Sequence, residues 1–129
     1  MFEMPKIVFE KIEEDAQLPE QNLVSDAGYI IKSIETKIIP EKELFTLNTG
    51  LKIFDITKGV WGSILSIDEL LEKHKIQVIP SIIENNFREE IKITLYNTSN
   101  KDYLINTGDC IAKLVFMPLL TLKTEFKND

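Results

Sequence analysis

The sequence has little cysteine, little histidine and a deficit of basic residues. Its single cysteine, Cys110, excludes an intrachain disulfide, and with one histidine it leaves no cluster of the Cys/His type for a metal. We therefore expect a reducing compartment, cytoplasmic or nuclear. Fifteen Lys and Arg against 21 Asp and Glu give a net charge of −6, and the lysines are interleaved with acidic and apolar residues. Non-specific binding to nucleic acid, which needs clustered basic residues, is excluded on this pattern.

Long apolar runs are also missing. No stretch approaches the roughly 20 apolar residues that a membrane-spanning helix needs. The first fifteen residues, MFEMPKIVFEKIEED, lack the basic start, apolar run and small-residue cleavage site of a secretory leader. We expect no membrane association.

What the chain does contain is a series of short β-rich runs. With 129 residues and 43% hydrophobic content, it can bury one core of ordinary size, so we expect a single domain over residues 1–129. Period-two alternation is clear in Ile91-Lys92-Ile93-Thr94-Leu95, and Pro, Gly, Asn, Asp and Ser separate the runs. An all-β sandwich or barrel is predicted, with strands at 6–12, 29–34, 36–39, 44–47, 51–54, 60–65, 76–83, 90–96, 103–105 and 110–116. Residues 67–73 alone carry a helical period and predict about two turns of helix.

Five fragments of the sequence occur in an order that resembles the dUTPase family. They are Ala27-Gly28-Tyr29; Asn48-Thr49-Gly50-Leu51; Lys58-Gly59-Val60-Trp61-Gly62; the stretch from Ser81 to Arg88; and Asn97-Thr98-Ser99 followed by Gly108-Asp109-Cys110-Ile111-Ala112-Lys113-Leu114. Together they span about residues 7–118. The resemblance implies a distorted jelly-roll subunit, a homotrimer, sites where subunits meet, and magnesium-dependent hydrolysis of dUTP to dUMP and pyrophosphate.

The residues that serve metal and phosphate in that family are replaced here. Ile30 stands where the family has an Asp that holds the magnesium–triphosphate complex through water, and an aliphatic side chain cannot do this. Ile67, Asp68 and Glu69 stand where it has the phosphate-binding Arg-Ser-Gly. At about 5 Å and an effective dielectric near 20, each new carboxylate would repel a phosphate charge by about 3 kcal/mol before screening. We therefore expect no metal site and no cofactor, with magnesium required only if activity is retained.

The third signature is partly kept. Glu84 matches the family's general base, one methylene longer than Asp, and Phe87 matches the aromatic residue that stacks on the sugar. Asn86 and Arg88 match neighbouring substrate-binding positions, whereas Glu89 replaces a glycine of the base-reading hairpin. The remnant site predicted from sequence is thus Glu84 as base with Asn86, Phe87 and Arg88 around the substrate.

The C-terminal segment, residues 119–129, contains no glycine, whereas the family closes its site with a glycine-rich lid. These losses favour a non-enzymatic dUTPase-fold protein that acts through contacts with an unknown protein partner; the Lys-, Ile- and Asn-rich composition adds a hint of a viral source. Two alternatives stay open. One is a divergent nucleotide-binding protein or weak hydrolase that uses the remnant site, and the other is a structural trimer within a larger assembly.

Overall fold

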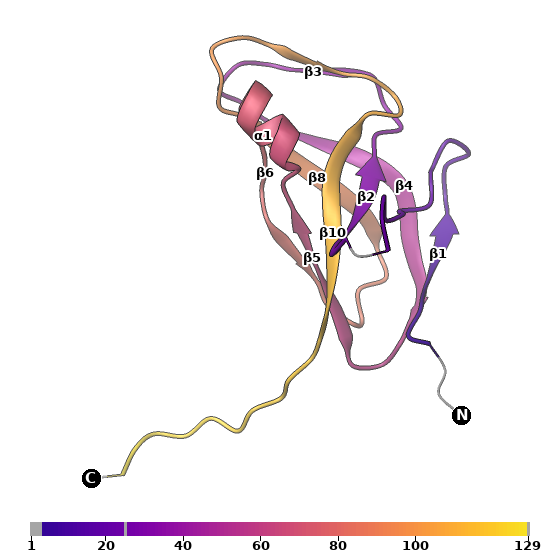
Figure 1. Ribbon diagram of the computed structural model, residues 1–129, viewed down its shortest axis with the longest axis vertical. Helices are drawn as coiled ribbons and strands as arrows, with labels where there is room; N and C mark the ends of the chain where they lie inside the picture. The colour runs from indigo at the N-terminus through magenta and orange to yellow at the C-terminus, as the bar shows by residue number, and fades with distance from the viewer. Residues whose placement is uncertain (1–3, 25, 129) are drawn as a thin grey trace.

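The computed structural model describes residues 4–24 and 26–128 and consists mainly of β-strands (Figure 1). One four-stranded sheet has the order β1 (Ile7–Lys11), β4 (Leu44–Ile56), β8 (Glu90–Asn97), β6 (Ile76–Val78). The second has the order β2 (Gly28–Lys32), β10 (Cys110–Pro118), β5 (Val60–Leu65), β7 (Ser81–Ile83). A two-stranded ribbon, β3 (Lys37–Ile39) with β9 (Tyr103–Ile105), and one helix, α1 (Asp68–His74), complete the described elements.

The core lies between the two four-stranded sheets. Strand β8 shows why the core forms between the sheets. Ile91, Ile93 and Leu95 are at most 1% exposed, while the residues between them lie on the other face of the strand. The second sheet contributes Ile31, Ile64, Leu114 and others, also at most 1% exposed. All these side chains belong to one hydrophobic cluster. The predicted all-β fold with one short helix is confirmed, as an open sandwich, because no backbone ladder joins the two large sheets within the described residues.

Two predicted strands, 44–47 and 51–54, are one continuous strand, so the turn expected between them is wrong. The register of β4 against β8 shifts between Asn48 and Lys52, which marks a bulge. Gly50, with φ +70°, supplies the left-handed conformation at the bulge. Its N–H donates to the Glu90 carboxylate at 3.0 Å, and the Thr49 hydroxyl donates to the Ile91 carbonyl at 2.5 Å. These bonds replace the ladder bonds that the bulge interrupts.

The predicted strand 76–83 is instead two strands in different sheets. Strand β6 pairs with β8, and β7 pairs with β5. Pro80 lies between them; because proline has no N–H to donate, it is suited to the point where the chain leaves one sheet for the other. This crossing positions the segment after β7, which carries the predicted base.

No helix among the described residues is long and apolar enough to cross a membrane. After β10 the chain runs as an extended segment away from the sandwich (Figure 1). Residues 119–128 form no regular element, although the Leu119 N–H donates to the Gly59 carbonyl at 2.7 Å where the segment begins.

Candidate active site

Hydrogen bonds hold the turn from Glu84 to Phe87 in place. The Phe87 N–H donates to the Glu84 carbonyl at 2.9 Å and closes the turn. The Asn85 side-chain amide donates to the carbonyls of Thr57 and Val60, at 3.0 and 2.7 Å, and so joins the turn to the β4–β5 connection. Glu84 is exposed beside these anchored groups. A carboxylate on an anchored backbone, open to water, is suited to accept a proton.

Arg88 braces the same turn and does not reach outward. Its guanidinium donates to the Asn85 carbonyl at 2.8 Å and to the Phe87 carbonyl at 2.9 Å. Sequence comparison suggested Arg88 as a substrate contact, and the structure places it as a support for Asn85 and Phe87. Asn86, the remaining predicted contact, lies exposed at the tip of the turn.

Phe87 and Glu89 line a cavity of about 630 Å³, here called the Phe87 cavity. Its walls come from β5, β7 and β8. Half-buried Phe87 offers a ring to a ligand in this space. The other lining residues are Ile64, Ser81, Ile82, Ile83, Glu90, Ile91 and Lys92.

A second cavity, of about 590 Å³, gathers all four of the replaced phosphate and metal positions. We call it the Lys113 cavity. It is lined by Ile30 of β2, Ile67, Asp68 and Glu69 at the start of α1, Lys113 of β10, and by Asn22, Asp26, Ala27, Gly28, Leu65 and Val115. Within the part of the chain that the structure describes, Lys113 is the only basic residue among these. The fold therefore brings together, in one concavity, residues that are up to 93 positions apart in the sequence, from Asn22 to Val115.

The carboxylates of the Lys113 cavity are partly occupied elsewhere. Glu69 forms an ion pair with Lys73, one turn along α1, at 3.4 Å. Asp26 accepts the Leu23 N–H at 3.0 Å within its own loop. Burial first, then the carboxylates of Asp109 and Glu69, raises the pKa of Tyr103.

The two cavities do not share a lining residue. Ile64 lines the Phe87 cavity and its neighbour Leu65 lines the Lys113 cavity, because successive strand residues point to opposite faces. Glu84, the predicted base, lines neither cavity. One copy of the chain thus keeps the predicted base and stacking ring apart from the predicted phosphate positions.

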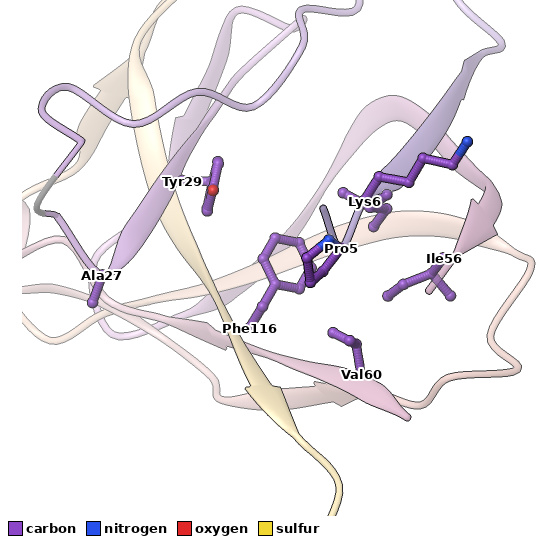
Figure 2. A pocket seen from close by; sticks show the side chains of 8 residues that line it. Pro5, Lys6, Ala27, Tyr29, Ile56, Val60 and Phe116 are labelled. Atoms are coloured by element: carbon purple, nitrogen blue, oxygen red, sulfur yellow. The ribbon is translucent and has the colours of Figure 1, made fainter. Parts of the chain in front are cut away.

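A third cavity, of about 300 Å³, opens at the end of the sandwich between β1 and β10 (Figure 2). Tyr29 and Phe116 meet there edge to face, with ring centroids 5.4 Å apart, and Pro5 lines the same cavity. None of the predicted site residues lines it.

The described residues do not fit a protein-held magnesium ion. Ile30, where the resemblance would require an Asp, presents only carbon atoms. No group of three or more His, Cys, Asp or Glu residues that could hold a metal occurs within residues 4–24 and 26–128. The prediction of no metal ligand in the sequence itself stays a prediction.

The open sandwich, with its anchored turn and its two cavities, defines an all-β protein with the dUTPase type of fold. A solved dUTPase from phage φ11 of Staphylococcus aureus matches it with a TM-score of 0.87 over 96% of this chain and 97% of that one, at 22% identity. The family description "dUTPase" matches residues 14–129. The chain belongs to the dUTPase family.

Relatives with a named activity are similar over most of their length. A deoxyuridine 5'-triphosphate nucleotidohydrolase of Paramecium bursaria Chlorella virus 1 is 33% identical over 92% of this chain and 83% of its own. The protein of the same name from Clostridium novyi is 34% identical over 93% of this chain and 85% of its own. Because these sources include a virus and a bacterium, a viral origin of this chain stays a prediction.

These comparisons overturn the expectation of a non-enzymatic scaffold that acts through protein contacts. Relatives about one-third identical over most of both chains are named as nucleotide hydrolases. The two alternative expectations, a divergent nucleotide-binding protein or weak hydrolase that uses the remnant site, and a structural trimer within a larger assembly, are not better supported by them. Sequence reasoning took each substitution as a loss, and it could not know that Glu69 is paired with Lys73 and that a lysine lines the same cavity.

Two residues with a clear place in the site were missed. Asn85 anchors the Glu84 turn, and a short polar residue two positions before the conserved-looking aromatic gave only a weak signal of it. Lys113 stands in the G-D-C-I-A-K-L fragment where the family pattern has Gln. That change of charge was visible in the sequence, but the position of Lys113 in the same cavity as Ile67 was not.

Proposed function

We propose that this chain hydrolyses dUTP to dUMP and pyrophosphate. The family membership and the nucleotidohydrolase relatives support the reaction. The single structural observation that carries it is the Glu84–Phe87 turn, where an exposed carboxylate and a half-buried ring sit on a backbone fixed by Asn85 and Arg88.

In this proposal Glu84 is the general base. Its carboxylate takes a proton from the water that attacks the α-phosphorus, the bond from that phosphorus to the bridging oxygen breaks, and pyrophosphate leaves. Phe87 stacks on the deoxyribose, and Asn86 at the tip of the turn contacts the substrate. Positioned proton transfer of this kind contributes about 10²- to 10⁴-fold to a rate.

The active assembly is proposed to be a homotrimer. In one copy the Phe87 cavity and the Lys113 cavity have no lining residue in common, so a site that uses both needs a second copy. A cyclic arrangement would bring the Glu84 turn of one subunit to the Lys113 cavity of the next and would repeat the site three times. The single core shared by both sheets supports residues 1–129 acting as one domain in each subunit.

The test is release of pyrophosphate from dUTP by the purified chain in magnesium-containing buffer, with dCTP, TTP and UTP as controls. We expect saturable release from dUTP and at least tenfold less from the other three. No release from dUTP above the buffer blank, at enzyme concentrations up to 10% of substrate, would contradict the proposal.

A further inference from the structure

The connection between β4 and β5, residues 57–60 and here called the 57–60 turn, is bonded to the residue next to Glu84. The turn is closed by its own backbone bond, from the Val60 N–H to the Thr57 carbonyl at 3.3 Å. The Asn85 side-chain amide donates to the same Thr57 carbonyl at 3.0 Å and to the Val60 carbonyl at 2.7 Å. Because an amide NH₂ group has two hydrogens, these bonds use both of its donors. Asn85 therefore ties the backbone beside Glu84 to a turn in a distant part of the sequence.

This tie matters because the proposed base is a glutamate. Its side chain has one more rotatable bond than that of aspartate, so its carboxylate can occupy more positions for a given backbone. A displacement of about 1 Å at a reacting group can cost about 10²-fold in rate. Asn85 is half-buried and Glu84 is exposed, so the amide restricts the backbone while the carboxylate stays open to solvent. A fixed backbone leaves only the side-chain torsions of Glu84 to vary.

The start of the C-terminal segment is attached to the same turn. Strand β10 ends with Pro118 opposite Val60 of β5, and the Trp61 indole N–H donates to the Pro118 carbonyl at 3.3 Å. The Leu119 N–H then donates to the Gly59 carbonyl at 2.7 Å, which extends the contact between β10 and β5 onto the 57–60 turn. Beyond this bond the segment runs away from the sandwich (Figure 1). The 57–60 turn thus lies between the segment and the Glu84 turn.

We propose that Asn85 is the positioning residue of Glu84, and that the bond from Leu119 to Gly59 helps to hold this position through the 57–60 turn. Asn85 acts through the backbone of Glu84 and not on the substrate. Whatever moves the start of the C-terminal segment then changes the rate of the reaction and not the binding of the substrate. The inference rests on the proposed function for the reaction, but the order of the Glu84 turn can be measured without it.

Steady-state kinetics with dUTP tests the two bonds separately. Asn85→Ala removes both amide donors, and Leu119→Pro removes the N–H that binds the Gly59 carbonyl. Leu120→Pro is the matched control, because Leu120 is 78% exposed and its N–H has no partner recorded among the described residues. We expect kcat to fall roughly tenfold in Asn85→Ala and about threefold in Leu119→Pro, with KM within about twofold of wild type. Leu120→Pro should behave as wild type.

The double variant shows whether the two bonds act through one route. In Asn85→Ala the connection from the 57–60 turn to Glu84 is already broken, so adding Leu119→Pro should lower kcat no further. If the two losses multiply instead, Leu119 does not act through Asn85 and the coupling is overturned.

Amide hydrogen exchange measures the order of the Glu84 turn without dUTP. The Phe87 N–H, which donates to the Glu84 carbonyl at 2.9 Å, is the probe, and the amides of β8 are the reference for the intact fold. We expect Asn85→Ala to speed exchange at Phe87 roughly tenfold relative to β8. Unchanged relative exchange, or unchanged kcat where wild type hydrolyses dUTP, would overturn the inference alone. If wild type does not hydrolyse dUTP, the proposed function fails, and exchange at Phe87 still decides whether Asn85 positions Glu84.

Discussion

At the scale of single residues, the site depends on groups that stand on anchored backbone. Glu84 has no side-chain partner recorded among the described residues, whereas the residues around it, Asn85 and Arg88, make four hydrogen bonds to main-chain carbonyls. The half-buried amide and guanidinium fix the turn, and the exposed carboxylate stays open to solvent, as the proposed role of a base requires.

Replacing Glu84 by Gln removes the proton acceptor and keeps the shape of the side chain. We expect kcat for dUTP to fall by roughly 10²- to 10⁴-fold with little change in KM, as for loss of a general base. Glu84→Asp, which keeps the carboxylate, is the matched control and should retain most of the activity. A Gln variant within twofold of wild type in the pyrophosphate-release assay would show that Glu84 is not the base.

A comparison of Gly50 with Gly59 separates the cost of backbone strain from the cost of steric crowding at a glycine. Both have positive φ, +70° and +84°, but a Cβ at Gly50 would lie 2.8 Å from the Glu13 Cβ, whereas a Cβ at Gly59 would meet nothing within 4 Å. We expect Gly59→Ala to lower the free energy of unfolding by about 1 kcal/mol and Gly50→Ala by about 2–4 kcal/mol. Urea denaturation of both variants measures this, and equal losses would contradict the bulge geometry.

At the scale of elements, buried Asn97 at the end of β8 holds three segments together. Its amide donates to the carbonyls of Ile39 and Lys101, at 3.0 and 2.8 Å, and its oxygen accepts the N–H and hydroxyl of Ser99. The sequence fragment Asn97-Thr98-Ser99 is therefore a structural joint between β3, β8 and the loop that leads to β9.

Asn97→Ala removes the side-chain donor to the buried Ile39 carbonyl, whereas the Lys101 carbonyl also accepts the Ser99 hydroxyl. We expect the free energy of unfolding to fall by about 1–3 kcal/mol, the cost of one unsatisfied buried group. The control is Asn100→Ala in the same loop, where the side chain is exposed. If the two variants have the same urea midpoint, the joint contributes nothing.

The sequence predicted where strands occur, but it did not predict which strands pair with each other. The alternation in β8 and the helical period before His74 predicted the strand and the helix to within a few residues. Each pattern reflects which residues of its own element are buried. The bulge at Gly50 and the change of sheet at Pro80 were misread as a turn and as one strand, since both depend on hydrogen bonds to distant segments. The candidate site was predicted incompletely for the same reason, because the pairing of Glu69 and the position of Lys113 depend on the tertiary structure.

At the scale of the whole molecule, the proposed site joins two cavities that share no lining residue in one copy of the chain, so the proposal calls for an assembly. We expect light scattering to give a mass near three times the 14.9 kDa of one chain, independent of concentration above the micromolar range. The assembly rather than the subunit would then bring Glu84 to the Lys113 cavity. A stable monomer that still hydrolyses dUTP would contradict this arrangement.

The central claim is that this chain cleaves dUTP between the α- and β-phosphorus atoms. A phosphorus-31 NMR time course of dUTP with wild-type protein and with Glu84→Gln tests it most directly. We expect wild type to convert the three triphosphate signals to those of dUMP and pyrophosphate, while the variant leaves them almost unchanged over the same time. Persistence of dUTP with wild-type protein, or appearance of dUDP with inorganic phosphate, would contradict it.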